Sequence, residues 1–411
     1  MSQVPNVEVE VHLGFDEETV RVGTAFVSLR RGTVTTNFNY DPTYLRRGDA
    51  WEISPDLPIA GGSAVTNGLP GAMTDSAPDR WGRNLIKKRL HAQAHENRQK
   101  EPTVTEVDYL LGVSDLTRQG TLRYTVDGGD FLAVGSAVPK LLELPRLLNA
   151  ADIVSRDDFS KDDMAAVKVL LDAGSGSLGG ARPKASVRDG DRLMIAKFPH
   201  HSDQWDVMAW EMTALDLAEA CGIQTPSRRL LDVTGKSVLL LERFDRDGAH
   251  RLPFISAMTL IQGRDGETRD YIEIAEALTD SGSSVRNDLV ELWRRIAFSI
   301  AINNTDDHLR NHGFLRQRSG WSLSPIFDVN PNPDTTATRS TSINFESDPD
   351  QTLAALFEAA PIFGVSPDRA SEIWGQVRSG VNGWKDAAIA NNVSDSDIRR
   401  FEAPFNAPHL V

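Results

Sequence analysis

The sequence predicts an α+β protein whose first half mixes strands with helices and whose second half is mainly helical. Two patterns support this class. Segments that alternate apolar and polar residues, or are rich in β-branched residues, cluster in the first third of the chain, at 7–15, 24–31 and 120–126. Beyond about residue 250 the apolar residues recur at helical spacing, most clearly at Leu289, Trp293, Ile296 and Ile300.

Other local patterns fill in the elements between these segments. We expect a helix over 75–90, with Pro78 and Asp79 near its start, and a second helix over 161–174. A hairpin over 183–198 is predicted by the Asp-Gly turn at its centre. A helix that ends near Cys221 and an apolar strand over 236–245 follow.

Composition and charge exclude several classes of protein. Hydrophobic residues make up 40% of the 411 and charged residues 25%, as in folded globular proteins. The net charge of −14 disfavours direct DNA binding. A single cysteine excludes an intrachain disulfide framework. The chain begins without a signal-peptide pattern and lacks an apolar run of roughly 18 residues, so we expect a cytoplasmic protein that does not span a membrane.

The stretch 303–314 has the residue types that phosphoryl transfer needs. Asp306 and Asn311 stand five positions apart, as do the catalytic Asp and the metal-binding Asn of protein kinases. The carboxylate would accept a hydroxyl proton, and the amide oxygen would hold Mg²⁺. His308 lies between them and is expected to brace the loop beside the cofactor. The alternative is an Asx-rich turn in which Asp306 or Asp307 caps backbone amides.

A second acid, Asp328, ends a short apolar strand about twenty residues after Asp306. This is the position of the second magnesium ligand in kinases, with Asp-Val-Asn in place of the usual Asp-Phe-Gly. A plain Asp–Asn turn after a strand is the alternative interpretation.

The glycine-rich segment 172–184 contains Gly174, Gly176 and Gly179 in a G-x-G-x-x-G pattern. A helix precedes it and a hairpin follows it, which is the reverse of a dinucleotide site. Successive glycine amides can instead form a nest for phosphate groups. The alternative is a flexible turn without a ligand.

Lys197 follows a short apolar run in a predicted strand, as does the lysine that pairs with ATP phosphates in kinases. A lysine among apolar residues needs an anionic partner, because an unpaired buried charge is costly. Glu211, on the next helix, is a candidate for that partner. The alternatives are a solvated lysine on an edge strand and a surface glutamate.

Taken together, these motifs resemble the HipA family of bacterial toxin kinases. The resemblance is carried by the segments 69–83, 177–184, 193–199, 217–226, 242–246, 305–311 and 323–329. It implies a two-lobed, protein-kinase-like fold that uses ATP and Mg²⁺. It also implies a Ser/Thr protein kinase that acts on a protein substrate, with aminoacyl-tRNA synthetases as the known family substrates. The implied partner is a small helix-turn-helix antitoxin, through which alone the chain would meet DNA.

Roles then carry over residue by residue from the resemblance. Asp306 would be the catalytic base, and Asn311 with Asp328 would hold magnesium. Lys197 would bind phosphates beside Gly176 and Gly179, and Ser177 would be the autophosphorylation site. Backbone groups at Glu242 and Phe244 would meet adenine, Asp245 would lie near the ribose, and Glu211 falls at a family glutamate.

The resemblance also suggests three parts in the chain. These are a β-rich part with a helical segment (1–145), a nucleotide-binding part with the glycine loop, strand lysine and hinge (146–245), and a helical part with the catalytic and metal loops (246–411). Two other functions remain open at this point. One is a kinase for a small molecule or lipid that uses the same catalytic core, and the other is a non-catalytic ATP-binding module that sequesters an antitoxin.

Overall fold

The computed structural model describes residues 6–15, 18–30, 33–132, 137–156, 163–177 and 182–406. The chain divides into two compact units. One comprises Met1–His201 with Asp245–Ile255, and the other comprises Ser202–Phe244 with Ser256–Val411. These units follow other boundaries than the expected parts 1–145, 146–245 and 246–411, which stay a prediction.

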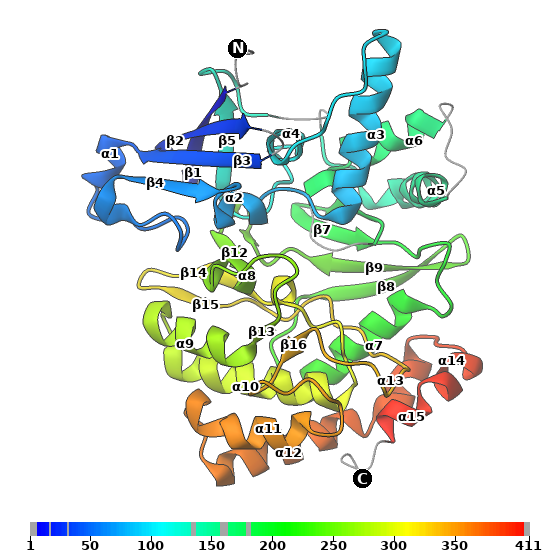
Figure 1. Cartoon of the computed structure of the whole chain (residues 1–411). Coiled ribbons are helices and arrows are strands. Elements are labelled where there is room, and N and C mark those ends of the chain that lie inside the picture. Colours follow the sequence, from blue (N-terminus) through cyan, green and yellow to red (C-terminus); the bar gives the residue numbers. More distant parts are fainter. Residues whose placement is uncertain are drawn as a thin grey trace. The chain divides into compact units, whose positions relative to one another are not determined.

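The first unit begins with a five-stranded antiparallel sheet (Figure 1). Its strand order is β4-β3-β2-β1-β5, built from β1 (Asn6–Phe15), β2 (Glu18–Arg30), β3 (Thr33–Tyr40), β4 (Ser63–Asn67) and β5 (Leu122–Val126). Val9, Val11 and Leu13 of β1 are fully buried, while the residues between them are not. The period-2 pattern of the sequence therefore places one face of this sheet in the core. The strand expected at 24–31 is the second part of the longer β2.

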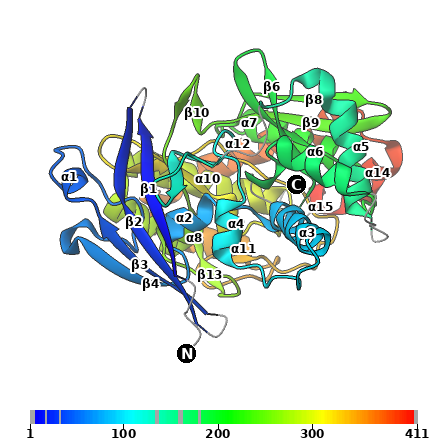
Figure 2. The ribbon, with the colours of Figure 1, turned by 90° about the horizontal axis from the view of Figure 1, so that it is seen from above.

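Three helices of the first unit lie together in Figure 2, where α6 contacts both α3 and α5. The helices of this unit are α1 (Pro42–Leu45), α2 (Gly71–Asp75), α3 (Arg80–Glu96), α4 (Glu106–Leu111), α5 (Leu144–Ser155) and α6 (Met164–Asp172), with short 3-10 turns η1 (Ile59–Gly61), η2 (Leu141–Glu143) and η4 (Ser175–Ser177). The helix expected over 75–90 instead starts at Arg80. Asp79 is its N-cap, with a carboxylate that accepts a hydrogen bond from the Gly82 amide.

The predicted hairpin over 183–198 is confirmed in the first unit. It consists of β6 (Lys184–Asp189) and β7 (Arg192–Lys197), which pair in antiparallel register. Gly190 in the turn has a φ of +60°, a conformation that favours glycine. A smaller ribbon joins β10 (Arg246–Asp247) to β11 (His250–Arg251).

The second unit is mainly helical, as expected. Its helices are α7 (Val207–Ala220), α8 (Ala257–Leu260), α9 (Tyr271–Ser281), α10 (Val285–Ala301), α11 (Thr352–Ala359), α12 (Pro367–Val381), α13 (Trp384–Ala390), α14 (Asp395–Arg400) and α15 (Glu402–Phe405). Shorter elements are β8 (Arg228–Val233), β9 (Lys236–Glu242), β13 (Arg269–Asp270), η5 (Leu309–Asn311), β14 (Gly313–Arg316), β15 (Trp321–Leu323), β16 (Thr341–Ser342) and η6 (Ala360–Phe363). The boundary between the units falls within β12 (Phe254–Ser256), after Ile255.

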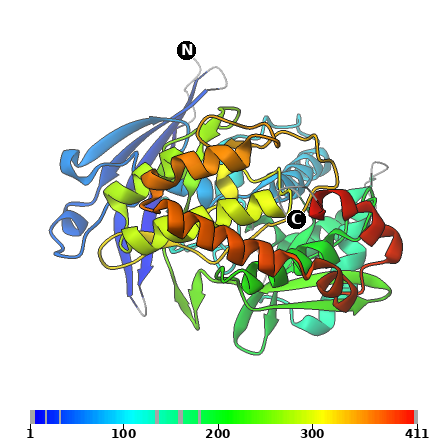
Figure 3. The same ribbon diagram turned by 90° about the horizontal axis from the view of Figure 1, so that it is seen from below.

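Helix α10 is the central helix of this unit, and Figure 3 shows it in yellow beside the orange α11 and α12. Trp293 and Ile296 are fully buried, and Leu289 and Ile300 are nearly so. The apolar stripe predicted from the sequence is therefore a core face, and the end of α10 delivers the chain into the residues around Asp306. Within the described ranges, no helix is long and apolar enough to cross a membrane.

Candidate active site

The loop 303–311 follows α10 directly and is fixed by buried polar contacts. Asn303 has a φ of +53° and turns the chain away from the helix axis. The buried guanidinium of Arg339 donates hydrogen bonds to the carbonyls of Ser299 (3.1 Å) and Asn304 (3.0 Å). The loop therefore has one defined backbone path on which its side chains are held.

Asp306 and Asp307 occupy opposite environments in this loop. Asp306 is exposed, and the Ser340 hydroxyl donates to its Oδ1 at 3.4 Å. Asp307 is only 8% exposed, accepts a 2.5 Å hydrogen bond from the Tyr271 hydroxyl and lies 3.1 Å from His312 Nε2. Asp307 therefore braces the loop, and Asp306 is the carboxylate that a substrate can reach.

The pKa of Asp307 reflects this bracing. Burial alone would raise the pKa, because it disfavours the charged form. The charge of His312 and the hydrogen bonds from His312, Tyr271 and Ser299 outweigh burial and lower the pKa to about 2. Asp307 is thus a fixed negative charge rather than a proton acceptor at neutral pH.

Asn311 and His308 shape the far end of the loop. The Asn311 backbone amide donates to the His308 carbonyl (2.8 Å), and its side-chain Nδ2 donates to the Asp306 carbonyl (3.1 Å). The His308 amide in turn donates to the Asp306 carbonyl (3.1 Å). Because the amide nitrogen of Asn311 is anchored, its orientation is fixed and its oxygen is the atom suited to a metal ion.

Asp328 lies in a segment that is hydrogen-bonded to the same loop. It is half-buried and has a φ of +56°, which is strained for a residue other than glycine. Four residues later, the Asn332 amide donates to the Asn303 carbonyl (3.0 Å) and its side chain donates to the Thr305 hydroxyl (2.7 Å). The structure thus joins the segment of Asp328 to the loop of Asp306 and Asn311.

The expected hinge residues Glu242 and Phe244 belong to the same unit. Glu242 ends β9, and its amide donates to the Ser227 carbonyl (2.8 Å). The Phe244 ring lies 5.4 Å from the ring of Phe327, the residue before Asp328. The end of the hinge therefore packs against the start of the segment that carries Asp328.

In the first unit, the Lys197 side chain is only 6% exposed at the end of β7. Its neighbour across the hairpin is Lys184, whose Nζ donates to Asp79 Oδ2 at 2.7 Å. Both charges of this Lys184–Asp79 ion pair are buried. Glu211 is fully buried in α7 of the second unit, and its ion pair with Lys197 stays a prediction.

The base of the glycine-rich segment is closed by contacts on both sides. The Ser175 hydroxyl donates to the Lys184 carbonyl, and Gly176 is buried within η4. A Cβ added at Gly82 of α3 would lie 2.9 Å from the Gly176 Cα, so the two backbones touch. The Ser177 side chain and Gly179 lie outside the described residues.

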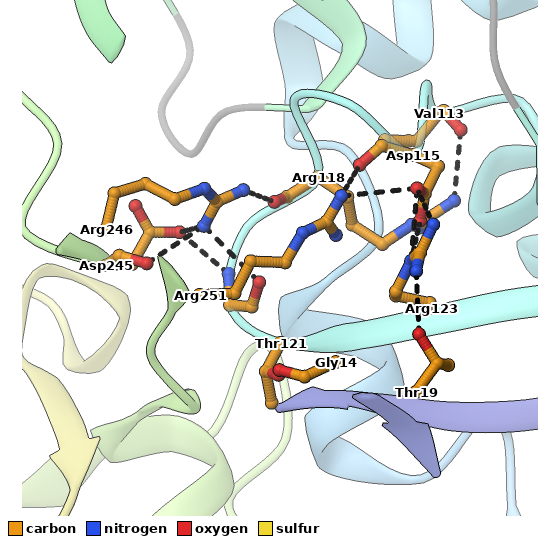
Figure 4. Close-up of polar contacts among 11 residues, drawn as sticks. Gly14, Thr19, Val113, Asp115, Arg118, Thr121, Arg123, Asp245, Arg246 and Arg251 are labelled. Atoms are coloured by element: carbon orange, nitrogen blue, oxygen red, sulfur yellow. Dashed lines mark hydrogen bonds and ion pairs between the residues drawn. The ribbon is translucent and has the colours of Figure 1, made fainter. Parts of the chain in front are cut away.

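Asp245 is 3% exposed and takes part in a buried polar network of the first unit (Figure 4). Its Oδ2 accepts from the Gly120 amide and from Arg246, both at 2.8 Å. Arg246 also donates to the Arg118 carbonyl (2.6 Å). Burial lowers the pKa of the fully buried Arg118 to about 10. Asp245 is therefore a structural acceptor, and its expected place near a ribose stays a prediction.

Asp79, Gly82 and Lys184 were not singled out as site residues from the sequence. All three lie in the segments that carry the family resemblance, 69–83 and 177–184. A signal existed for Asp79, because an acidic residue after proline at a helix start is typical of an N-cap. Nothing local indicated that its carboxylate would also pair with a lysine 105 positions away.

The donor set fits magnesium bound together with phosphates. Among the residues that the structure describes, no group of three or more His, Cys, Asp or Glu side chains could hold a metal ion. A magnesium ion in a nucleotide site needs fewer protein ligands, because phosphate and water oxygens complete its octahedron. The carboxylate of Asp328 and the amide oxygen of Asn311 are oxygen donors of the type that such an ion takes, and their role as its ligands stays a prediction.

Comparisons with known proteins identify the family and the fold. Two family models match, one described as a HipA-like C-terminal domain (residues 176–384) and one as a HipA N-terminal domain (residues 18–100). A HipA–HipB–operator DNA complex from Shewanella oneidensis MR-1 matches with a TM-score of 0.69 and 14% identity, over 98% of this chain and 95% of that chain. This likeness confirms the α+β, protein-kinase-like fold class.

Two more distant structures also align with part of the chain. The Helicobacter pylori proinflammatory kinase CtkA aligns with a TM-score of 0.34 and 15% identity, over 51% of this chain and 94% of that chain. The choline kinase LicA from Streptococcus pneumoniae aligns with a TM-score of 0.21 and 12% identity, over 57% of this chain and 91% of that chain. No curated protein matches the sequence.

Proposed function

Because this chain belongs to the HipA family, we propose that it is an ATP-dependent Ser/Thr protein kinase, the toxin of a type II toxin–antitoxin module. The observation that best supports this proposal is the pair of adjacent aspartates in one braced loop. The exposed Asp306 is suited to proton transfer, and the buried Asp307 holds the loop through Tyr271 and His312. A binding module that used ATP only as a structural ligand would not need this division of roles.

In this proposal each site residue has one task. ATP bound with magnesium supplies the transferable phosphoryl group and neutralises its charge. Asp306 accepts the proton of the attacking hydroxyl, and Asn311 and Asp328 hold the metal ion. The hinge, at Glu242 and Phe244, meets the adenine through its backbone. Lys197 pairs with the phosphates.

Ser177 is the proposed site of autophosphorylation, in the same glycine-rich segment as Gly176 and Gly179. A phosphate there adds roughly −1.5 to −2 charges. At about 4 Å from an ATP phosphate, each pair of unit charges would repel by about 4 kcal/mol at an effective dielectric constant of 20. Phosphorylated Ser177 would therefore oppose ATP binding and switch the enzyme off.

Asp306→Asn tests the proposed reaction, with phosphate transfer from radiolabelled ATP to proteins and to small molecules of a cell lysate as the measurement. We expect wild-type protein to label proteins and itself, with the self-label mapped to Ser177 by mass spectrometry. Asp306→Asn should lose about 10²- to 10⁴-fold in rate and keep its affinity for ATP, because the amide keeps the volume but cannot accept the proton.

Asp280→Asn makes the same change at an exposed position of the same unit, at the end of α9, and serves as the control. If Asp306→Asn transfers phosphate at the wild-type rate, Asp306 is not the catalytic base. If the label is found only in the small-molecule fraction, the chain is a small-molecule kinase and not a protein kinase. ATP binding without any transfer would favour a non-catalytic module.

A further inference from the structure

The segment 339–346 is fixed to the loop that carries Asp306. The Ser340 amide donates to the Thr305 carbonyl (2.9 Å), and the Thr341 hydroxyl donates to the Asp307 carbonyl (2.8 Å). Arg339, at the start of the segment, donates to Asn304. Whatever this segment presents to solvent is therefore held at a fixed place relative to Asp306.

The segment ends in a tight turn with an unusual residue at its tip. Ile343 and Glu346 exchange backbone hydrogen bonds of 2.8 and 3.0 Å, so Asn344 and Phe345 are the two central residues. Their φ angles are +50° and +66°, the pattern of a type I′ turn. Asn is a favoured residue at the first position and Gly at the second, but here the second residue is Phe.

Buried Asp270 holds this turn in its strained conformation. It is 3% exposed and is the N-cap of α9. Its Oδ2 accepts from the Ser342 hydroxyl and the Phe345 amide, both at 2.6 Å, and its Oδ1 accepts from the Asn344 amide at 3.3 Å. A single carboxylate thus accepts hydrogen bonds from three polar groups of the turn, and these bonds fix the backbone of Phe345.

The side chain of Phe345 adds no buried apolar surface to the fold. It is 84% exposed, the largest exposure of any large hydrophobic residue in the described part of the molecule. A phenylalanine in a left-handed conformation is strained, and an exposed one buries no apolar surface. Strain that the surrounding structure maintains without benefit to folding indicates a function.

We propose that Phe345 is an anchor for the protein that receives the phosphoryl group. Its ring would enter an apolar pocket of that protein beside the acceptor hydroxyl. The pocket would have a basic rim, because Glu346 and the exposed Asp348 and Asp350 follow Phe345 closely in the chain. The segment that carries the turn is hydrogen-bonded to Thr305 and Asp307, the residues on either side of Asp306, so the ring is held at a fixed place relative to the proposed base. This inference rests on the proposed protein kinase activity.

Phe345→Gly separates this role from a structural one. Glycine relieves the strain at positive φ, so we expect the melting temperature to rise by about 2 °C. Loss of a buried aromatic anchor should lower kcat/KM for protein acceptors at least about tenfold. The assay uses phosphatase-treated lysate proteins as acceptors and radiolabelled ATP as the donor, and it measures the label transferred to the proteins. Self-phosphorylation and KM for ATP should stay unchanged.

Two further variants complete the design. Asn392 is an exposed residue elsewhere in the same unit with a φ of +59°. Asn392→Gly relieves the strain of that conformation and should leave phosphate transfer unchanged. Phe345→Tyr should retain most of the transfer, because it keeps the ring. Phe345→Asn provides a second loss variant that tolerates positive φ.

The outcomes distinguish this inference from the function on which it rests. If wild-type protein labels lysate proteins and Phe345→Gly labels them at the same rate, the anchor is wrong and the kinase stands. If wild-type protein labels no protein, itself included, both proposals fall; if it labels only itself, the anchor falls and a self-phosphorylating kinase remains. If Phe345→Gly alters only self-association in size-exclusion chromatography or only antitoxin binding, Phe345 contacts those partners instead and the proposal is overturned.

Discussion

Asp307 carries a charge on which the folded state depends. Its pKa is about 2 in the folded protein, because the charge and hydrogen bond of His312 and the hydrogen bond of Tyr271 outweigh burial. An aspartate in an unfolded chain has a pKa of about 3.9. A folded pKa below the unfolded one stabilises the protein above the unfolded pKa, and this stability is lost as the pH falls from about 4 to about 2. The difference amounts to about 2–3 kcal/mol.

Asp307→Asn should therefore lower the free energy of unfolding at pH 7 and flatten its dependence on pH between about 4 and 2. Urea unfolding at a series of pH values measures both effects. Asp306→Asn is the matched control, because the neighbouring carboxylate is exposed. An Asp307→Asn variant with the full acid dependence of wild-type protein would show that other carboxylates carry it.

At this scale the sequence indicated two residues of the loop, Asp306 and Asn311, but not the contacts that fix the loop; their catalytic roles stay a prediction. The five-residue spacing indicated Asp306 and Asn311, and the structure joins them by a hydrogen bond. The alternative, that one of the two aspartates caps backbone amides, is not what fixes Asp307, which braces the loop through the side chains of Tyr271 and His312. Its partner Tyr271 lies 36 positions away, beyond the reach of any local pattern. Phe345 could not have been found, because its exposure and its φ are visible only in the fold.

Helix α3 and the glycine-rich segment meet through two glycines. A Cβ at Gly82 would lie 2.9 Å from the Gly176 Cα, 3.0 Å from its carbonyl oxygen and 2.8 Å from the Pro78 Cβ. These are mostly backbone atoms, which cannot turn aside as a flexible side chain can. The start of α3 therefore sets the position of the base of the segment that we assign to phosphate binding.

Gly82→Ala should destabilise the protein by about 1–3 kcal/mol through this collision and raise KM for ATP. Gly375→Ala is the matched control, because Gly375 is also inside a helix but has nothing within 4 Å of an added Cβ. That change should stabilise the protein by up to about 1 kcal/mol, from helix propensity alone. Thermal unfolding and ATP titration compare the two. Equal stability and equal KM would show that the contact has no role.

Elements that follow from local chemistry were predicted well. The hairpin at 183–198 has its Asp-Gly turn, and α10 has its apolar stripe on the core side. The start of α3 was placed too early, because the apolar pattern did not show where Asp79 would cap the helix. The close approach of Gly82 to Gly176 joins two elements distant in sequence, so no periodicity indicates it.

For the whole molecule, the sequence predicted the fold class and the family but not the division of the chain into two units. The motifs predicted an α+β, kinase-like chain, which the family and structural matches confirm. The return of Asp245–Ile255 to the first unit was not predicted. It depends on contacts such as that of Asp245 with Gly120, 125 positions apart in sequence.

The acidic charge of the whole chain leads to the last prediction. With a net charge of −14, the chain repels a phosphate backbone over most of its surface. We predict that it meets DNA only through a small helix-turn-helix antitoxin, the partner that the motif resemblance to the HipA family implies. Fluorescence anisotropy of a labelled operator duplex, with the chain alone and with the partner, measures this.

The chain alone should show no binding at 50 mM salt, where electrostatic attraction is strongest. With the partner, binding should appear and weaken as salt rises, and its salt dependence should match that of the partner alone, because the partner makes the phosphate contacts. A steeper dependence in the ternary mixture would mean that this chain contributes its own cationic contacts to DNA. Tight binding by the isolated chain would contradict the prediction outright, since it would require a basic surface that overcomes the overall negative charge.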